Sequence, residues 1–382
     1  MTASRRLLYA VAAPVIALIV TLIITSIVIL ISGANPLDAF SNMIDYSTRA
    51  RGVTSIINQA TPLFIAGVAV AIGFQMNLFN IGVEGQYRLA GLIAAWAGAQ
   101  IAWPAPFHVL FIIVVAMVVG SLWAGIAGVL KVTRNVNEVI STIMLNQIAF
   151  GVILWLFNDF LREEGGGGLA AHTKQIPRSG WMPSIDPIVE FFGIDLPSGR
   201  SAIYGFVLIA IALGAFYWIA LTRTRFGFDL RASGLNPNAA LTSGVNPKRM
   251  VVITMLMSGA IAGLIGLPTL MGNTRFYDEA FPAGLGFDGI AVALLGQYHP
   301  IGMAVGALLF GFLDYSSGGL QLADIEPEVV AIMKGTIMLC SVIAFTVVRR
   351  KAAAAEVRDA ARQMDEHRGG RPTTAVPSEA PA

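Results

Sequence analysis

The sequence has unusually few charged residues. Among its 382 residues, 25 are Lys or Arg and 23 are Asp or Glu, so charged residues make up 13% of the chain, against about 25% in a typical soluble domain. The net charge is only +2, which gives no strong basic field to hold a nucleic acid. A single cysteine, Cys340, excludes an intrachain disulfide. These shortages argue against a soluble enzyme, a disordered protein or a nucleic-acid binder.

Long apolar runs take the place of charge. A helix that crosses a bilayer core needs roughly 20 apolar residues, and we identify ten candidate runs: Tyr9–Ile31, Ile56–Phe74, Leu89–Trp103, Phe107–Leu130, Val139–Phe157, Ala202–Leu221, Val251–Met271, Gly284–Leu295, Ile301–Leu313 and Val329–Val348. The sequence therefore predicts an all-α integral membrane fold, a polytopic bundle of about ten transmembrane helices within residues 1–350. The short runs Gly284–Leu295 and Ile301–Leu313 also fit half-helices.

Basic residues predict the orientation of this bundle. With ten spans, four basic clusters fall on one side: Arg5–Arg6, Lys131–Arg134, Arg223–Arg249 and Arg349–Lys351. The positive-inside rule assigns that side to the cytoplasm. Arg49 and Arg51 disagree but are outnumbered. Both termini are therefore predicted to be cytoplasmic.

Three polar segments hold most of the charge. The external loop 159–200 contains Gly165–Gly168 and four prolines, which predicts irregular structure; it serves either as a docking surface or as a plain connection. The cytoplasmic loop 222–249 is discussed below. The tail 351–382 is rich in Ala, Gly, Pro and Thr, is predicted to be disordered, and receives no activity.

Common catalytic motifs are absent. The sequence contains no Gly-x-x-x-x-Gly-Lys-[Ser/Thr] loop for phosphates and no His-Glu-x-x-His or Gly-x-Ser-x-Gly motif. Its four histidines lie far apart, and none has a second ligand at helical spacing: His108, His172, His299 and His367. We expect neither a metal site nor a catalytic residue.

The segment Asn77–Gln86 joins the second and third predicted spans and is rich in amides. Its glycines at 82 and 85 suit a broken helix with close backbone approach. Two interpretations of Glu84 remain open. It is either paired inside a re-entrant element beside a transport path, or interfacial, where it would cap the amides at the start of the third span.

The loop 222–250 carries a complete set of helix signals. Asn236 is a good N-cap, Pro237 suits the first helical position, and Gly244 can supply a left-handed residue after two turns. Such a short helix is unstable alone, so a cytosolic partner is expected to bind it. The simpler alternative is a surface turn between two spans.

Other polar residues lie inside the apolar runs: Asn58, Gln59, Asn146, Gln147, Asp288, Gln297 and Lys334. Each either binds a neutral polar solute or bonds a neighbouring helix. Only Glu84, Asp288 and Lys334 are ionisable, which weakens a proton-driven carrier because such carriers use buried acid and base relays.

Three motifs together carry a family resemblance. Leu78–Gln86 resembles the "LFNIGxEGQ" motif of bacterial permeases of ATP-binding-cassette (ABC) importers. Arg225–Ala240, followed by Gly244-Val245, is similar to "FGxxLRAxGxNPxAA…AGI", and Gly286–Gly296 is similar to "GxGFxGIAVALLG". The resemblance runs from about Asn35 to Arg350. It points to the nucleoside and simple-sugar group within the branched-chain amino acid permease superfamily.

The resemblance implies a division of labour. This chain would be a multi-pass permease of the bacterial plasma membrane, with no cofactor of its own. A second permease subunit, a cytosolic ABC ATPase that binds ATP and Mg, and an extracellular or lipid-anchored solute-binding protein would be its partners, alongside membrane lipid. The implied ATPase-coupling residues are Gly234, Leu235, Asn236, Pro237, Ala239, Ala240 and Gly244.

We therefore expect a transport subunit that moves a neutral polar solute, a nucleoside, by alternating access. The path is expected to involve Asn77, Asn80, Glu84, Gln86, Asn146, Asp288 and Gln297. The alternatives are a permease for a simple sugar such as ribose and an ion-coupled secondary transporter in which Glu84 or Asp288 is essential. A membrane enzyme would need a pair among Glu84, Asp288 and His299, which the spacing does not support.

Overall fold

A computed structural model describes residues 3–49, 51–163, 171–191, 193, 202–322, 325–326, 328–341, 343 and 347. Gly165–Gly168, Arg349–Lys351 and the tail 351–382 lie outside the described residues. Within that part of the chain the structure is helical, with three isolated β-bridges and no strand. The predicted all-α fold is confirmed. Residues Thr25–Lys334 form one compact unit, which holds every site discussed below; Met1–Ile24 and Gly335–Ala382 are assigned to a second.

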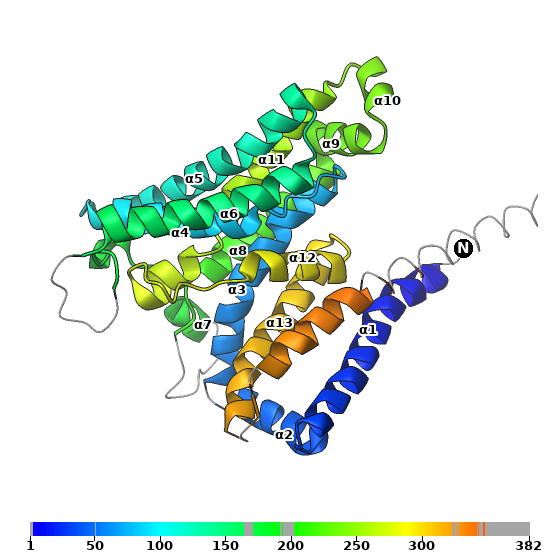
Figure 1. Cartoon of the computed structure of the whole chain (residues 1–382), viewed down its shortest axis with the longest axis vertical. Coiled ribbons are helices and arrows are strands. Elements are labelled where there is room, and N and C mark those ends of the chain that lie inside the picture. The colour runs from blue at the N-terminus through cyan, green and yellow to red at the C-terminus, as the bar shows by residue number, and fades with distance from the viewer. Residues whose placement is uncertain are drawn as a thin grey trace, which may run out of the picture. The chain divides into compact units, whose positions relative to one another are not determined.

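The helices follow one another along the chain as Figure 1 shows. They are α1 (Ala3–Ile31), α2 (Pro36–Ser47), α3 (Gly52–Phe74), α4 (Val83–Ala99), α5 (Ala105–Arg134), α6 (Glu138–Leu156) continued by the π-helix η1 (Phe157–Leu161), the 3-10 turn η2 (Arg178–Gly180), α7 (Asp186–Phe191), α8 (Phe206–Arg223), α9 (Arg225–Leu235), α10 (Pro237–Thr242), α11 (Pro247–Gly263), the π-helix η3 (Pro268–Thr274), α12 (Leu285–Leu295) and α13 (Pro300–Gln321). Residues 328–341 are also helical.

Six helical segments of the described chain are long and apolar enough to cross a membrane: α3, α5, α6 with η1, α8, α11 with η3, and α13. Ile19–Ile31 and Pro36–Ser47 make a seventh if the pair, bent by 112°, is one span. The uncertain run Ile301–Leu313 lies in α13, which has 22 residues. The run Gly284–Leu295 is the 11-residue helix α12, which is too short to span a bilayer core alone.

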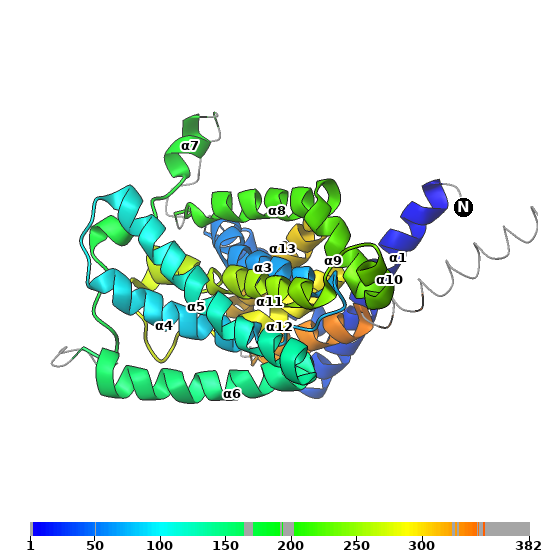
Figure 2. The same cartoon turned by 90° about the horizontal axis from the view of Figure 1, so that it is seen from above.

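Helix α3 lies at the centre of the Thr25–Lys334 unit. Residues 60–73 of α3 are buried, and Figure 2 shows α8, α11, α12 and α13 around it. Small residues permit this close packing: a Cβ at Gly289 of α12 would lie only 2.6 Å from the Cβ of Ala66. The crossing of α5 and α11 is equally tight, because Gly120 and Gly259 face each other's carbonyl oxygens. Close backbone approach of this kind is typical of helices packed in lipid.

Candidate functional site

The predicted short helix in the cytoplasmic loop is present as α10. The Asn236 side chain accepts hydrogen bonds from the backbone N–H of Asn238 and of Ala239, both at 3.1 Å, with Pro237 at the first helical position. Gly244 has φ +83°, the left-handed conformation expected after the helix. Ala240 is buried, but residues 235–239 are exposed, Leu235 by 83%. The predicted caps are therefore confirmed, and α10 presents a free outer face.

A second helix, α9, precedes α10 and was not predicted. Thr224 caps it, accepting a hydrogen bond from Gly227 N–H at 3.3 Å. Leu230 and Ser233 are buried, so α9 is fixed to the bundle by one face. Figure 1 shows α9 and α10 together at the end of the bundle reached by α5 and α11. The loop is thus a helical pair anchored to the spans, not a simple turn.

The loop touches the amide-rich segment directly. Asn77 Nδ2 donates a hydrogen bond to the carbonyl oxygen of Gly234 at 2.8 Å. A Cβ at Gly234 would lie 2.7 Å from the backbone of Met76, so only glycine fits there without displacement. Asn77 itself has φ +54°, a conformation that asparagine tolerates. The end of α9 is therefore bonded directly to the start of the 77–86 segment.

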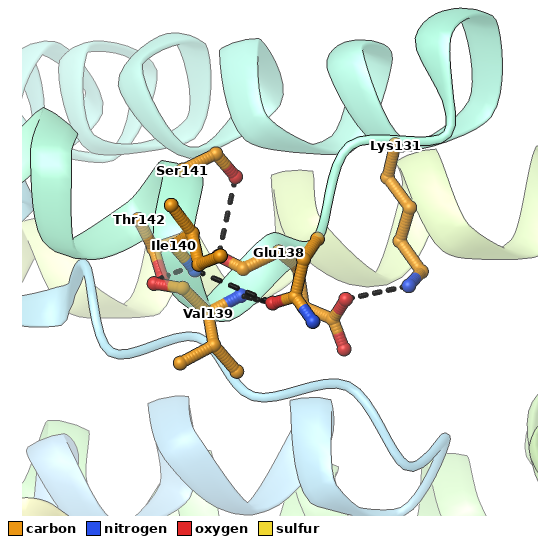
Figure 3. A network of polar contacts seen from close by, with 7 residues as sticks. Lys131, Glu138, Val139, Ile140, Ser141 and Thr142 are labelled. Atoms are coloured by element: carbon orange, nitrogen blue, oxygen red, sulfur yellow. Dashed lines mark hydrogen bonds and ion pairs between the residues drawn. The ribbon is translucent and has the colours of Figure 1, made fainter.

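A polar corner between α5 and α6 borders the same loop. Lys131 Nζ lies 2.5 Å from the Glu138 carboxylate, and the hydroxyls of Ser141 and Thr142 turn back to the Glu138 carbonyl (Figure 3). The Asn137 side chain caps α6 by accepting from Val139 and Ile140 N–H, whose nitrogens Figure 3 also shows. A notch next to this corner is lined by Lys131, Val132, Thr133, Arg134, Asn135, Pro237, Pro247, Lys248 and Val251. Basic side chains of α5 and α11 thus gather at this end.

The segment after α3 folds back into the bundle and closes a buried amide network. Asn80 and Gln86 exchange hydrogen bonds through their side-chain amides, at 3.0 and 2.8 Å. Asn80 also donates to Ser258 Oγ at 2.8 Å, and Ser258 donates to the Ala69 carbonyl at 2.6 Å. Asn80 is 2% exposed and Gln86 1%. These amides bond α3, α4 and α11 to one another.

Asn146 of α6 completes this network from the other side. Its Oδ1 accepts a hydrogen bond from Gly85 N–H at 2.9 Å, and its Nδ2 donates to the Ile81 carbonyl at 2.9 Å. The side chain is 2% exposed. Both ends of the amide are therefore used to hold the backbone at the start of α4.

Glu84 caps a helix, but a different one from the helix proposed on sequence. It lies in the first turn of α4, yet its carboxylate accepts hydrogen bonds from Gly284 N–H at 2.8 Å and Gly286 N–H at 2.9 Å, at the start of α12. The Tyr87 hydroxyl lies 3.0 Å from the same carboxylate and 2.7 Å from the Pro282 carbonyl. Glu84 is 2% exposed, so it is buried within the protein. It joins the starts of α4 and α12.

An open cavity lies near the opposite end of α3. Its volume is about 460 Å³, within the roughly 300–1,000 Å³ range of small-molecule sites. Its lining comes from α3, the start of α8, η3, α12, α13 and the helix of residues 328–341: Ser55, Asn58, Gln59, Thr61, Pro62, Tyr204, Phe206, Pro268, Thr269, Asn273, Pro282, Ala283, Leu285, Asp288, Asp314 and Lys334. Pro282 and Leu285 flank the two amides that Glu84 caps, so the cap and the cavity share a wall.

Neutral amides and hydroxyls line one side of the cavity. Both ends of the Asn58 amide bond the protein, since it donates to the Ala202 carbonyl at 2.7 Å and accepts from Tyr204 N–H at 3.2 Å. Gln59 Oε1 is buried and has no hydrogen-bond partner in the described part of the chain. Gln59 thus carries an unused acceptor beside the cavity, which a ligand reaches only if the side chain turns.

Three charged side chains line the cavity as well. Lys334 Nζ lies 2.7 Å from Asp288 Oδ2 and 2.5 Å from Asp314 Oδ1. Among the described residues, no three His, Cys, Asp or Glu side chains are grouped so that they could hold a metal ion.

The predicted path residues divide into two groups. Asp288 lines the cavity. Asn80, Glu84, Gln86 and Asn146 are buried in bonds to the protein, and Asn77 bonds the loop. Gln297 lies outside the cavity lining, in a left-handed turn with φ +51°. Sequence analysis did not assign the remaining lining residues to a path, although Asn58, Gln59 and Lys334 had been singled out as polar residues in apolar runs.

Comparison with known proteins gives a consistent result. The family described as the permease component of the branched-chain amino acid transport system matches residues 52–342. The guanosine ABC transporter permease protein NupP of Bacillus subtilis is 32% identical over 336 residues, 85% of this chain and 91% of NupP. A second guanosine permease protein of that bacterium, NupQ, also matches.

Two further relatives carry different solute names. The nucleoside ABC transporter permease protein NupB of Lactococcus lactis is 30% identical over 365 residues, 92% of this chain and 97% of NupB. The glucose ABC transporter permease protein TsgB13 of Haloferax volcanii is 27% identical over 333 residues, 85% of each chain. No solved structure matches the chain significantly. The chain therefore belongs to the permease-component family of the branched-chain amino acid transport systems, as a multi-pass, non-catalytic subunit of an ABC transporter in the cell membrane that is expected to hold no cofactor itself.

Proposed function

We propose that this chain is the membrane subunit of an importer for a nucleoside, driven by a separate ATPase through alternating access. The observation that carries the proposal is the open cavity of about 460 Å³. Uncharged amides and hydroxyls line it, and Gln59 Oε1 is an unused acceptor there. Such groups suit a neutral polar solute, and relatives over most of the chain are named for guanosine and nucleosides.

Energy enters at the α9–α10 loop in this proposal. Leu235 and Leu241 are 83% and 63% exposed beside the capped turn, which supports docking of an ATPase subunit there. The proposed coupling residues are Gly234–Pro237, Ala239, Ala240 and Gly244. The contact of Asn77 and Met76 with Gly234 supports transmission from this loop to the 77–86 segment. The Glu84 cap would then carry the displacement to the cavity wall.

The proposed topology places residues 1–350 in about ten spans with both termini in the cytoplasm. The positive-inside rule supports a cytoplasmic assignment for the α9–α10 end, because one notch there is lined by Lys131, Arg134 and Lys248. The cavity then opens on the outer side. Fusions of a reporter to loops 159–200 and 222–249 test this: the first is expected outside and the second inside.

The proposed assembly contains a second permease subunit, a cytosolic ATPase with ATP and Mg, and an extracellular or lipid-anchored solute-binding protein. Two guanosine permease proteins in Bacillus subtilis, NupP and NupQ, support a heteromeric membrane part. Membership of the permease family favours this ATP-driven assembly over an ion-coupled carrier. A simple sugar remains the second candidate solute, because TsgB13 is named for glucose.

Uptake in membrane vesicles tests the proposal. Vesicles that contain this chain with its partner subunits are expected to accumulate guanosine only when ATP is present on the side of the membrane that carries the ATPase subunit. Glucose or ribose in excess is expected not to compete with guanosine for uptake. Uptake by the chain alone, insensitive to ATP depletion, would contradict the ATP-driven function. Competition by the sugar and not by nucleosides would contradict the proposed solute.

A further inference from the structure

Asp288, Asp314 and Lys334 form one ionic cluster on the wall of the cavity. Asp288 lies in the first turn of α12, Asp314 in α13, and Lys334 in the helix of residues 328–341. The lysine ammonium lies between the two carboxylates, at 2.7 and 2.5 Å. The side chains of Lys334, Asp288 and Asp314 are 15%, 23% and 32% exposed, so all three face the cavity while remaining partly desolvated.

The cluster carries an excess negative charge. Two carboxylates and one ammonium give a net charge of −1, and no other charged side chain of the described residues lines the cavity. Proteins focus the field of such a charge inside a cleft, because the walls have a low dielectric constant. Screening by salt is weaker there than on an open surface.

We propose that this cluster is a charge filter: it admits neutral, hydroxyl-rich solutes to the cavity and refuses phosphorylated ones. The inference rests on the proposed function for the identity of the solute, but the charge of the three side chains that line the cavity does not depend on which solute enters. A phosphate group on a nucleoside or a sugar adds one to two negative charges, which the excess carboxylate repels. A neutral nucleoside or sugar meets no such repulsion.

The same carboxylates also favour donors over acceptors. Each ionised carboxylate accepts up to four hydrogen bonds, and Lys334 uses only one oxygen of each. The remaining positions suit a pair of adjacent donors, such as the vicinal hydroxyls of a ribose or the ring N–H and amino group of guanine. Gln59 Oε1 on α3 is an additional unused acceptor in the cavity. The cavity is therefore suited to an uncharged solute that presents several donors.

Cysteine labelling measures this field without reference to a substrate. Asn273 lines the cavity and is exposed, and Cys340 is the single native cysteine, so Asn273→Cys in a Cys340→Ser background places one thiol in the cavity. The assembled importer in membranes is treated with trimethylammonioethyl or sulfonatoethyl methanethiosulfonate. The labelling rate of each reagent is divided by its rate with a free thiol in solution. The cationic reagent is then expected to react at least about tenfold faster than the anionic one.

Charge variants separate the field from the ion pairs. Asp314→Asn leaves the Lys334–Asp288 pair and brings the net charge to zero, so the rate ratio is expected to fall towards one. Asp288→Asn with Asp314→Asn is expected to invert the ratio. Lys334→Met with Asp314→Asn removes both bridges but keeps a net charge of −1, and is expected to retain the unaltered ratio. A ratio that does not change in the first two variants overturns the charge filter. So does a Lys334→Met/Asp314→Asn ratio equal to that of Asp314→Asn, because the ratio would then follow the presence of Asp314 and not the net charge.

Competition with phosphorylated and modified solutes gives the second readout. Guanosine 5′-monophosphate is expected to compete for guanosine uptake in the Asp314→Asn importer and not in the unaltered one; equal exclusion in both overturns the filter as the cause of discrimination. Two modified nucleosides identify which donors are recognised. Adenosine has the diol without the guanine donor pair, and 2′,3′-dideoxyguanosine has the donor pair without the diol. If neither competes where guanosine does, the cavity recognises the diol and the donor pair together. If the labelling ratios follow the charges but no nucleoside is transported, the filter stands and the proposed solute is wrong.

Discussion

Two polar regions of the same bundle differ in how their hydrogen bonds are used. Around the 77–86 segment, Asn80, Gln86 and Asn146 spend their side-chain amides on other parts of the protein and are almost fully buried. At the cavity, Gln59 has an acceptor without a partner among the described residues, and the Asp288 side chain is 23% exposed. The first region is built to hold helices together and the second to meet a solute. Polar residues inside a membrane bundle thus either bond helices together or face a solute, and their hydrogen-bond partners distinguish the two roles.

Removal of the Glu84 cap is expected to have the largest effect. Glu84→Ala leaves the N–H groups of Gly284 and Gly286 without their partner, and each unsatisfied buried group costs about 1–3 kcal/mol. A loss of roughly 2–6 kcal/mol is expected to lower the yield and the melting temperature of the purified assembly. Glu279→Ala, at an exposed carboxylate in the 275–284 connection, is the control and is expected to change neither. Equal stability of the two variants would contradict the claim that the Glu84 carboxylate stabilises the bundle by capping the start of α12.

Overpacking of the α5–α11 crossing is expected to follow. A methyl group at Gly259 would collide with the backbone of Gly120, which costs about 1–3 kcal/mol. Thermal unfolding of Gly259→Ala is therefore expected at a lower temperature. The matched control is Gly151→Ala on α6, where a Cβ meets nothing within 4 Å and alanine is favoured by up to about 1 kcal/mol. Destabilisation of both variants to the same extent would show that helix packing is not the cause.

A matched pair of amide substitutions tests the comparison directly. Asn80→Ala leaves Gln86 without its reciprocal partner, at an expected cost of about 1–3 kcal/mol. Gln59→Ala removes an acceptor that has no partner in the described structure, so the stability is expected to stay within about 0.5 kcal/mol while the KM for guanosine uptake rises. Thermal unfolding and uptake kinetics of the two variants are compared. If Gln59→Ala is the more destabilising of the two, the division between holding and binding residues is wrong.

Loss of the α10 cap is expected to change stability only slightly and coupling strongly. Asn236→Ala removes the acceptor for two N–H groups, and an N-cap contributes about 1 kcal/mol. Solute-stimulated ATP hydrolysis by the assembled importer is expected to fall while labelling of the cavity is retained. Asn137→Ala removes a similar cap from α6 and serves as the control. If both variants lose stimulation equally, the effect of Asn236 does not come from the proposed coupling helix.

Local signals predicted local structure well. The cap at Asn236, the proline after it and the left-handed Gly244 are encoded within nine residues, so α10 was correctly predicted. Helix α9 was missed because Arg225–Leu235 is polar, short and held mainly by burial of one face. The apolar runs likewise predicted helices, and the short run Gly284–Leu295 corresponds to the 11-residue helix α12.

Long-range pairings could not be predicted from the sequence. Glu84 accepts from amides 200 and 202 residues away, and its position at a helix start suggested a cap on its own helix. Lys334 and Asp288 were both visible as charges in apolar runs, but their meeting depends on how α12 packs beside the helix of residues 328–341. Hydropathy identifies which polar residues are unusual; only packing shows whether they face a cavity or another helix.

Solute protection of a cavity thiol is the most direct test of the account. In a Cys340→Ser background, Asn273→Cys reports on the cavity and Thr242→Cys, exposed on α10, reports on the loop. Guanosine added to the assembled importer without ATP is expected to slow the labelling of Asn273→Cys and to leave the labelling of Thr242→Cys unchanged. The ATPase subunit is expected to shield Thr242→Cys and not Asn273→Cys. No protection of Asn273→Cys by guanosine, with uptake intact, would contradict the assignment of the cavity as the solute site.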